Sequence, residues 1–297
     1  MKLTILGTAS QLPTRTRNQN GYLFEWFEEG ILFDPGEGTQ RQFIHAGISP
    51  GKVHRIFISH FHGDHCLGLP GMMQRLSLME VPQTVSICYP AEGEEYFRSL
   101  CRSSKYTQRI EFEARPLKEG LVEETERYRI EAYALKHSTP VLGYRFIRKP
   151  QLRFDRTKLE AAGLKGPVVG KLEAQGSVSC RGKHFTRQEL SYRTPEKVFA
   201  YALDTGKCEN ITPLIRNADG LLMEATYLDS GEQALAEKVM HMTAEQAAVY
   251  ARDNGVKQLI LTHYSERYKD PAIYEKAVEK IFKNTHIAHD FDVLNIT

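Results

Sequence analysis

The segment His60-Phe61-His62-Gly63-Asp64-His65 decides how this chain is interpreted, and it directly follows the apolar run Arg55-Ile56-Phe57-Ile58-Ser59. The apolar run has the pattern of a buried strand. At a strand's end, histidines two residues apart are expected to point the same way. The glycine permits a sharp turn, which would bring the aspartate and the last histidine round to the same cavity.

Three imidazoles and a carboxylate would each carry a desolvation cost of a few kcal/mol if they were buried without partners. A metal ion removes that cost, so we predict metal ligands at His60, His62, Asp64 and His65. They could saturate one ion or serve two. Neutral imidazole and carboxylate suit Zn²⁺ best, with Mn²⁺ or Fe²⁺ as alternatives. We interpret the adjacent Cys66 as a small apolar start to the next helix, and a ligand role for it stays open.

Composition places the chain among ordinary globular proteins. Its 297 residues are 41% hydrophobic, and 39 Lys and Arg stand against 37 Asp and Glu, which excludes a histone-like polycation. No apolar run approaches the roughly 20 residues needed to cross a bilayer, so we expect no membrane partner. The five cysteines are widely spread without a Cys-x-x-Cys pair, which argues against a disulfide framework. We therefore expect a cytoplasmic protein.

Short apolar runs alternate with glycine turns and with helical patterns, which predicts an α/β layered domain with a mixed sheet. Helices are expected at 39–46, 92–101 and 243–254, the first and last ended by glycine. Strands are expected at 3–6, 22–24, 31–33, 55–59, 84–89, 129–135, 143–147, 198–203, 220–223 and 258–262.

One stretch differs in charge from the rest. Residues 152–197 carry ten basic side chains against five acidic ones, a net charge of +5, while the remainder of the chain is −3. Taken alone, the stretch fits a solvated surface insertion as well as a surface that binds a polyanion.

The six-residue motif resembles the His-x-His-x-Asp-His signature of the metallo-β-lactamase superfamily. The resemblance implies an αββα sandwich and three more ligands at the ends of later strands. His137, Asp204 and His263 each follow a predicted strand and complete a set of five histidines and two aspartates. By the resemblance, each subunit would hold two Zn²⁺: one on His60, His62 and His137, the other on Asp64, His65 and His263, with Asp204 bridging.

Over nearly its whole length the chain is similar to the ribonuclease Z family, the transfer-RNA 3′-processing endonucleases. The resembling segments, in chain order, are 6–8, 17–18, 32–40, 60–71, 143–145, 204–205, 224–226, 241–248 and 262–268. The resemblance implies dinuclear metal-assisted phosphodiester hydrolysis that removes the 3′ trailer of precursor tRNA. Three residues depart from the family pattern: Leu203, Met223 and Met242.

The same resemblance implies roles for individual residues. Asp64 would accept a proton from the attacking water. Glu224 would orient His241, which would act on the leaving 3′-oxygen as a general acid. Ser265 and Arg267 would bind phosphate, since the planar guanidinium fork matches phosphate oxygens.

Residues 152–193 occupy the place of a flexible arm that short family members use to clamp tRNA, inserted within a single domain spanning 1–297. Lys165, Gly166, Pro167 and Lys171 resemble the family's arm motif, and the resemblance also implies a homodimer. Two other interpretations remain: a phosphodiesterase of the same fold that acts on small phosphodiesters, and a non-catalytic RNA-binding homologue that keeps zinc for stability.

Overall fold

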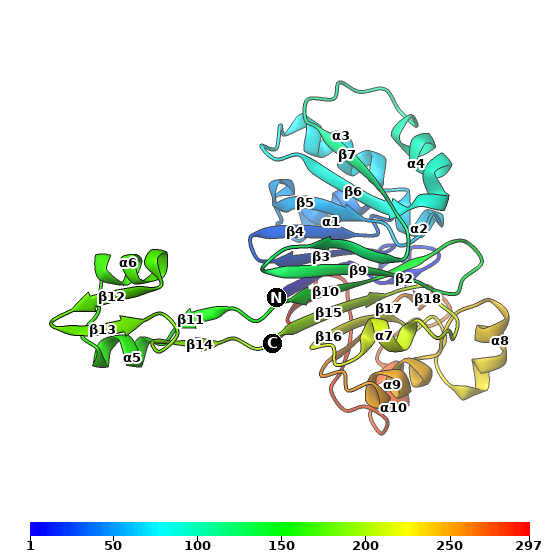
Figure 1. Ribbon diagram of the computed structural model, residues 1–297. Coiled ribbons are helices and arrows are strands. Elements are labelled where there is room, and N and C mark those ends of the chain that lie inside the picture. The colour runs from blue at the N-terminus through cyan, green and yellow to red at the C-terminus, as the bar shows by residue number, and fades with distance from the viewer. The chain divides into compact units, whose positions relative to one another are not determined.

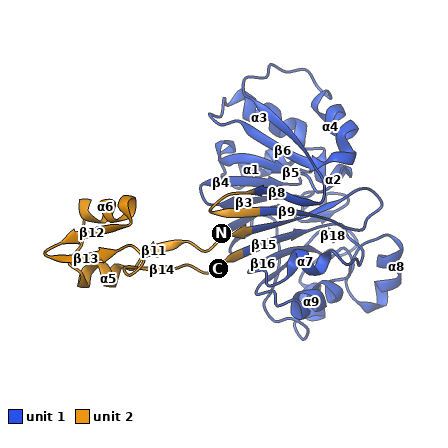
Figure 2. Ribbon diagram, in the orientation of Figure 1, with its two compact units in different colours: residues 1–123, 130–146, 198–297 blue, residues 124–129, 147–197 orange.

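The computed structural model describes residues 1–297, which divide into two compact units. Residues 1–123, 130–146 and 198–297 form the main unit, and residues 124–129 and 147–197 form the inset unit (Figure 2). The inset unit contains the arm expected at 152–193. None of the helices combines the length and the apolar composition that crossing a bilayer requires.

Two seven-stranded sheets make up the protein's layers (Figure 1). The first runs, in spatial order, β20 (Val293–Asn295), β1 (Lys2–Gly7), β3 (Gly21–Trp26), β4 (Glu29–Phe33), β5 (Val53–Phe57), β6 (Val85–Pro90) and β7 (Phe112–Leu117). The second runs β19 (Thr285–Ile287), β17 (Leu259–Thr262), β16 (Gly220–Glu224), β15 (Lys197–Ala202), β10 (Leu142–Arg148), β9 (Tyr128–Ala134) and β8 (Gly120–Glu124).

The inner faces of the two sheets meet through aromatic side chains. Phe24 stacks on Phe199 with ring centroids 4.2 Å apart, and Phe33 stacks on Tyr201 at 4.3 Å. All four are fully buried. Aromatic pairs of this kind contribute about 0.5–1.5 kcal/mol each beyond the burial of their area.

Helices cover the outer faces, which completes the expected αββα sandwich. The helical elements of the main unit are α1 (Thr39–His45), η1 (Pro50–Lys52), α2 (Gly63–Cys66), α3 (Leu69–Leu78), η2 (Ala91–Gly93), α4 (Glu94–Cys101), α7 (Ile211–Ile215), η3 (Ser230–Glu232), α8 (Gln233–Lys238), α9 (Ala244–Asp253) and α10 (Ile273–Val278). Phe43 of α1 and Met72 and Leu76 of α3 pack on the first sheet. Helix α9 packs on β16 and β17 of the second.

The expected elements of the main unit agree with those observed to within a few residues. Helix α9 illustrates the physical reason. Thr243 and Gln246 form a reciprocal capping box at its start, and Gly255 ends it with a φ of 67°. Its alanines are buried, so the helix can approach the sheet closely.

The inset unit has a small hydrophobic core of its own, built on Leu164, Leu172 and Leu190. Its elements, for which the sequence predicted neither helix nor strand, are β11 (Leu152–Phe154), α5 (Arg156–Ala161), α6 (Pro167–Gln175), β12 (Ser177–Cys180), β13 (Lys183–Thr186) and β14 (Ser191–Arg193). Strands β11 and β14 pair antiparallel, as do β12 and β13.

Candidate metal centre and active site

The candidate ligands come from strand ends of both sheets. His60 lies just after β5, His137 after β9, Asp204 after β15 and His263 after β17. Strands β15, β16 and β17 are mutually parallel, so their carboxyl ends share one edge of the second sheet. Segments more than a hundred residues apart in sequence therefore deliver polar side chains to one cavity.

Two of these residues have unusual backbone conformations. Asp204 has a φ of 43° and His263 a φ of 61°, in the left-handed region that L-residues rarely occupy. Such conformations cost of order 1–3 kcal/mol and concentrate at functional sites. His263 directly follows β17, and Asp204 lies two residues after the last residue of β15.

His60, His62 and His137 form one group of candidate ligands. The Nδ1 atom of His62 lies 3.0 Å from Nε2 of His60 and 3.2 Å from Nε2 of His137. The Oδ2 atom of Asp204 is 3.5 Å from Nε2 of His60 and 3.7 Å from Nε2 of His137. Four donor atoms that converge in this way could hold one metal ion.

Asp64, His65 and His263 form the second group. The Oδ2 atom of Asp64 lies 3.3 Å from Nε2 of His65 and 3.4 Å from Nε2 of His263. The Oδ1 atom of Asp204 is 3.4 Å and 3.0 Å from the same two nitrogens. The two oxygens of the Asp204 carboxylate therefore face different groups.

The residues present fit a pair of cations. Oδ1 of Asp204 and Nε2 of His263 are buried, and although they lie 3.0 Å apart neither forms a hydrogen bond of acceptable geometry. Buried polar atoms are almost always paired, so two such atoms side by side indicate that a ligand completes the site. Imidazole nitrogens with carboxylate oxygens and no thiolate are the ligands of a divalent metal such as Zn²⁺.

Hydrogen bonds to the outer nitrogens orient four of the five rings. The acceptors are Ser59 Oγ for His60 at 2.9 Å, Asp34 Oδ2 for His65 at 2.7 Å, the Met240 carbonyl for His137 at 3.1 Å, and Thr226 Oγ1 for His263 at 2.8 Å. When Nδ1 holds the proton in this way, Nε2 offers its lone pair to the cavity.

Asp34, which sequence reasoning did not assign to the site, is at the centre of this support. Its carboxylate accepts hydrogen bonds from the backbone and hydroxyl of Ser59 and from the hydroxyl of Tyr201, each at 2.6 Å, as well as from His65. The available signal was its position directly after a predicted strand, which it shares with Asp204 and His263. Asn20 was missed as well, and its amide lies 3.3 Å from Oδ2 of Asp64.

Charge in the cavity favours a cation. Burial lowers the pKa of His60, His62 and His137, which keeps these imidazoles neutral. Burial also acts to lower the pKa of His65, but the surrounding Asp204, Asp64 and Asp34 outweigh it and raise that pKa. Burial acts to raise the pKa of Asp204, yet the neighbouring imidazoles hold it well below its usual range.

Glu224 and His241 form a pair beside the two groups. The fully buried Glu224 carboxylate lies 3.0 Å from Nδ1 of His241 and accepts hydrogen bonds from the backbone of Thr205 and the hydroxyl of Thr226, both at 2.6 Å. Burial acts to lower the pKa of His241, but Glu224 outweighs it and raises that pKa to about 9. Glu224 therefore orients the imidazole of His241 and favours its protonated form.

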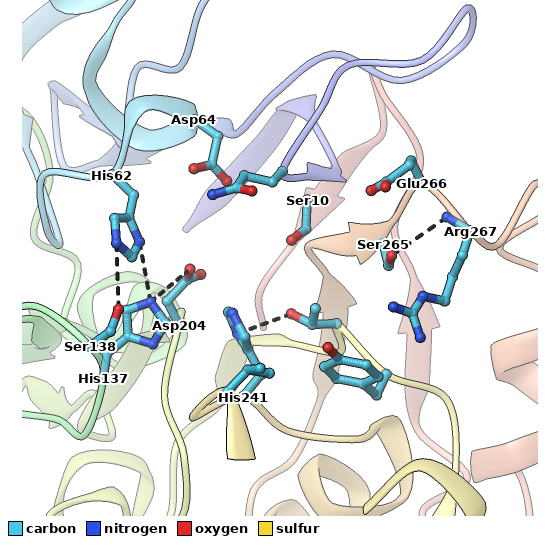
Figure 3. A pocket seen from close by; sticks show the side chains of 14 residues that line it. Ser10, His62, Asp64, His137, Ser138, Asp204, His241, Ser265, Glu266 and Arg267 are labelled. Carbon is cyan, nitrogen blue, oxygen red and sulfur yellow. Dashed lines mark hydrogen bonds and ion pairs between the residues drawn. The ribbon is translucent and has the colours of Figure 1, made fainter. Parts of the chain in front are cut away.

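A cavity of about 280 Å³ opens onto these residues. Figure 3 shows His62, Asp64, His137 and Asp204 on one side, Ser265 and Arg267 on the other, and His241 between them; all seven line the cavity.

Arg267 stands at this cavity between two side chains of the protein. Its guanidinium lies 3.3 Å from Glu232 and 5.0 Å from the ring centre of Tyr227. The side chain is 46% exposed, so it remains accessible to a ligand despite the ion pair.

The arm residues belong to the inset unit. Lys165, Gly166, Pro167 and Lys171 are all exposed. Gly166 has φ 59° and ψ −134°, a conformation that is essentially restricted to glycine, and Pro167 is the first residue of α6, where its missing N–H costs nothing.

The sharp turn expected at Gly63 takes the form of a helix start. Gly63 has no positive φ and begins helix α2. One helical turn brings Asp64 and His65 to the cavity. A Cβ at this position would come within 2.9 Å of the end of the Leu67 side chain, which is 54% exposed and free to move.

Other expectations about neighbouring residues are now decided. Cys66 ends α2 rather than starting the next helix, its thiol donates to the carbonyl of His62, and burial raises its pKa to about 12, so it is a neutral thiol. Leu203, Met223 and Met242 are fully buried. The backbone N–H of Met242 donates to Glu224 at 3.2 Å, so its side chain is not part of that contact.

Comparison with known proteins agrees with this geometry. A profile described as the anti-Pycsar protein Apyc1 matches residues 1–146, and a β-lactamase superfamily domain matches residues 172–264. The structure of the short form of human tRNase Z (ELAC1) superposes with a TM-score of 0.71 at 24% identity, covering 100% of both chains, which shows the shared fold.

Sequence relatives share much higher identity. Ribonuclease Z of Chlamydia abortus is 46% identical over 98% of this chain and 95% of its own length. Ribonuclease Z of Protochlamydia amoebophila is 44% identical over 97% of this chain and 94% of its own length. With its seven candidate ligands around one cavity and relatives of this similarity along nearly its whole length, the chain belongs to the ribonuclease Z family.

Proposed function

We propose that this chain is a zinc-dependent endoribonuclease that removes the 3′ trailer from precursor tRNA. The observation that carries the proposal is the Asp204 carboxylate, whose two oxygens face two separate groups of ligands. A carboxylate shared in this way is the arrangement expected of a dinuclear hydrolytic site. A single structural zinc would leave one of the two groups without a purpose.

The ions would be held as the superfamily resemblance implies: one by His60, His62 and His137, the other by Asp64, His65 and His263, with Asp204 between them. When bound, two Zn²⁺ ions, or Mn²⁺ or Fe²⁺ in their place, supply a deprotonated water near neutral pH and positive charge for the phosphate.

The side chains of the protein would carry the protons. Asp64 lines the cavity and would accept the proton of the attacking water. As the new phosphorus–oxygen bond forms, the bond from phosphorus to the ribose 3′-oxygen breaks. His241 would donate its proton to that oxygen, and the buried Glu224 would hold the imidazole in place during the transfer. The products are a 3′-hydroxyl on the RNA body and a 5′-phosphate on the trailer.

Ser265 and Arg267 would bind the scissile phosphate or its neighbour. Both line the cavity on the side away from His62 and His137 (Figure 3). Arg267 would exchange its contact with Glu232 for phosphate oxygens, which accept two parallel hydrogen bonds from a guanidinium.

The inset unit would bind the RNA body. Its exposed Lys165 and Lys171, together with the +5 charge of residues 152–197, support electrostatic attraction to backbone phosphates. Gly166 and Pro167 would shape the start of the helix that carries Lys171. Family resemblance supports two more proposals: the chain forms a homodimer, and it acts in the cytoplasm.

Incubation of the protein with an end-labelled precursor tRNA tests the proposal. We expect one cleavage near the 3′ end of the tRNA body, loss of cleavage after chelation, and recovery on addition of zinc. A small chromogenic phosphodiester in parallel tests the alternative substrate class. Turnover of that substrate with no cleavage of precursor tRNA would favour the small-phosphodiester interpretation. Binding of RNA without cleavage of either substrate would favour the non-catalytic one.

A further inference from the structure

Arg17 is a buried arginine that the proposed reaction leaves without a role. Only 6% of the residue is exposed, and its guanidinium makes no ion pair. Instead it donates to three backbone carbonyls: Nη1 to Tyr264 at 3.1 Å, and Nη2 to Ser265 at 3.2 Å and to Tyr268 at 2.9 Å. The ring centre of Tyr264 lies 6.0 Å from the guanidinium, and the charge of Arg17 also acts on Asp290. A buried arginine without an ion pair still calls for an explanation.

The three carbonyls belong to the turn that carries Ser265 and Arg267. The backbone N–H of Tyr268 donates to the carbonyl of Ser265 at 3.2 Å, which closes the turn. Arg17 binds the carbonyls at both ends of this turn with a single nitrogen. The guanidinium therefore fixes the distance and angle between the two ends.

The remaining contacts from the N-terminal segment hold only the first part of this turn, while its far end also bonds Glu232 through Tyr268 and packs on the ring of Tyr274. Strand β18 (Tyr264–Ser265) pairs with β2 (Ala9–Ser10), and the N–H of Glu266 donates to the carbonyl of Ser10 at 3.1 Å. This pairing ends before Arg267. Arg17 is thus the contact through which the N-terminal segment reaches the far end of the turn.

Arg17 is itself held firmly. Its backbone N–H donates to Oγ1 of Thr14 at 3.0 Å, and its carbonyl accepts from the N–H of Thr14 at 2.8 Å. The next residue, Asn18, donates through its backbone N–H to Asp290 at 2.7 Å. A rigid backbone at residues 14–18 makes the guanidinium a fixed point for the turn.

We infer that Arg17 is a positioning residue that presents Ser265 and Arg267 to the substrate phosphate. The inference rests on the proposed function, in which those two residues bind phosphate. Lysine would replace the planar fork only in part, because all its N–H groups are on one nitrogen, whereas Arg17 uses two nitrogens to reach three carbonyls. A displacement of about 1 Å at a phosphate-binding group can cost on the order of 10²-fold in rate.

A double-mutant cycle tests the inference. The value of kcat/KM for precursor tRNA is measured for the wild type, Arg17→Met, Arg267→Ala and the double variant. We expect Arg17→Met to lose on the order of 10²-fold while metal content stays unchanged. In the double variant, the Arg17 substitution should cost no more than a few-fold beyond Arg267→Ala alone, since its effect acts through Arg267. Additive losses would overturn the inference, as would unchanged turnover in Arg17→Met.

Two further variants separate positioning from folding. Arg145 also donates to a backbone carbonyl, that of Leu214 at 2.7 Å, and lies 4.0 Å from Glu131, so Arg145→Met controls for the loss of a largely buried arginine elsewhere. Its effect on kcat/KM should be small and additive with Arg267→Ala. Arg17→Lys keeps the charge and should show the same non-additivity with a smaller loss. If Arg17→Met does not fold, the double-mutant cycle is measured with Arg17→Lys in its place.

The cycle also distinguishes failure of this inference from failure of the proposed function. If the wild type and Arg145→Met do not cleave precursor tRNA, the proposed function is wrong. If both cleave it and the Arg17 and Arg267 effects add, the proposed function stands and Arg17 has only a structural role.

Discussion

The Nδ1 atom of His241 lies 3.0 Å from each of the two carboxylate oxygens of Glu224. The carboxylate cannot turn away, because backbone N–H groups of Thr205 and Met242 also donate to it. The ring of His241 is therefore held with Nδ1 inward, and its other nitrogen is free to act on a leaving group.

Replacement of His241 by alanine should lower turnover of precursor tRNA by about 10²–10⁴-fold, the usual contribution of a general acid. Single-turnover rates measure this effect, and metal analysis accompanies them. We expect the metal content to stay near that of the wild type. Loss of metal would instead make His241 a ligand, a role that its proximity to Asp204 and His263 makes worth testing. Glu224→Gln should lower the rate in the same direction, because the amide no longer stabilises the protonated ring.

Replacement of Asp64 by alanine should stop cleavage and leave RNA binding largely intact. Its carboxylate serves the second ligand group and lines the cavity, whereas the proposed RNA-binding charges lie elsewhere. A cleavage assay measures the turnover of the RNA, and a filter-binding assay measures the affinity for the same RNA. Asp253→Ala is a suitable control, since Asp253 is exposed and pairs only with the adjacent Arg252. Unchanged turnover in Asp64→Ala would refute the role of Asp64.

Removal of residues 152–193 should abolish cleavage of precursor tRNA and spare a small phosphodiester. The deletion can be closed with a short linker, because Gln151 and Thr194 already exchange hydrogen bonds of 2.8 and 2.9 Å. Equal loss of both activities would argue against an RNA-binding arm. The milder pair Lys165→Ala and Lys171→Ala should weaken RNA binding and flatten its dependence on salt.

Replacement of Asp34 by asparagine should destabilise the metal-free protein by about 3 kcal/mol, since it leaves buried donors unpaired. Asparagine is the appropriate choice because residue 34 has a φ of 42°, which asparagine tolerates. Urea unfolding in a chelator measures the change. Tyr201→Phe removes only one of the donors and should cost about 1 kcal/mol. Equal effects of the two variants would show that the network is not centred on Asp34.

Asp290 should make stability fall as pH rises between about 4 and 6. Burial raises its pKa to about 6, although hydrogen bonds from Asn18 and Thr8 act in the opposite direction. The unfolded chain has the lower pKa, so over this range the folded state binds more protons, and the contribution of Asp290 is lost as pH rises through 6. Relative to Asp290→Asn, the wild type should lose up to about 3 kcal/mol between pH 4 and 7, measured by urea unfolding in a chelator. A constant difference across that range would contradict the assignment.

Sequence reasoning located the candidate ligands because each one sits where an apolar strand ends, a feature that is local and visible in the chain. It could not locate their supports. Asp34, Thr226 and Arg17 act through partners up to about 250 residues away, and no local pattern specifies such a partner. The hydrogen bonds from Tyr201 to Asp34 and from Arg17 to Tyr264 and Tyr268 also need the two sheets to come together.

Two local features escaped prediction for a different reason. The sequence predicted a sharp turn at Gly63 but not its form, which is the first residue of helix α2 without a positive φ. The inset unit gave no clear periodicity, because its core rests on three leucines at irregular spacing, Leu164, Leu172 and Leu190. A core of this size is too small to produce a recognisable apolar pattern in a segment rich in charged residues.

Asp34 also couples the packing between the two sheets to the ligand cluster in the cavity. Through Tyr201 it belongs to the stacked rings between the sheets, and through His65 it belongs to the ligand cluster. A change in what the cavity binds can therefore affect the interior through one hydrogen bond, that between His65 and Asp34. The melting temperature of the whole protein should therefore rise when metal binds and fall when it is removed. A thermal-shift measurement alone would then report whether the centre holds metal.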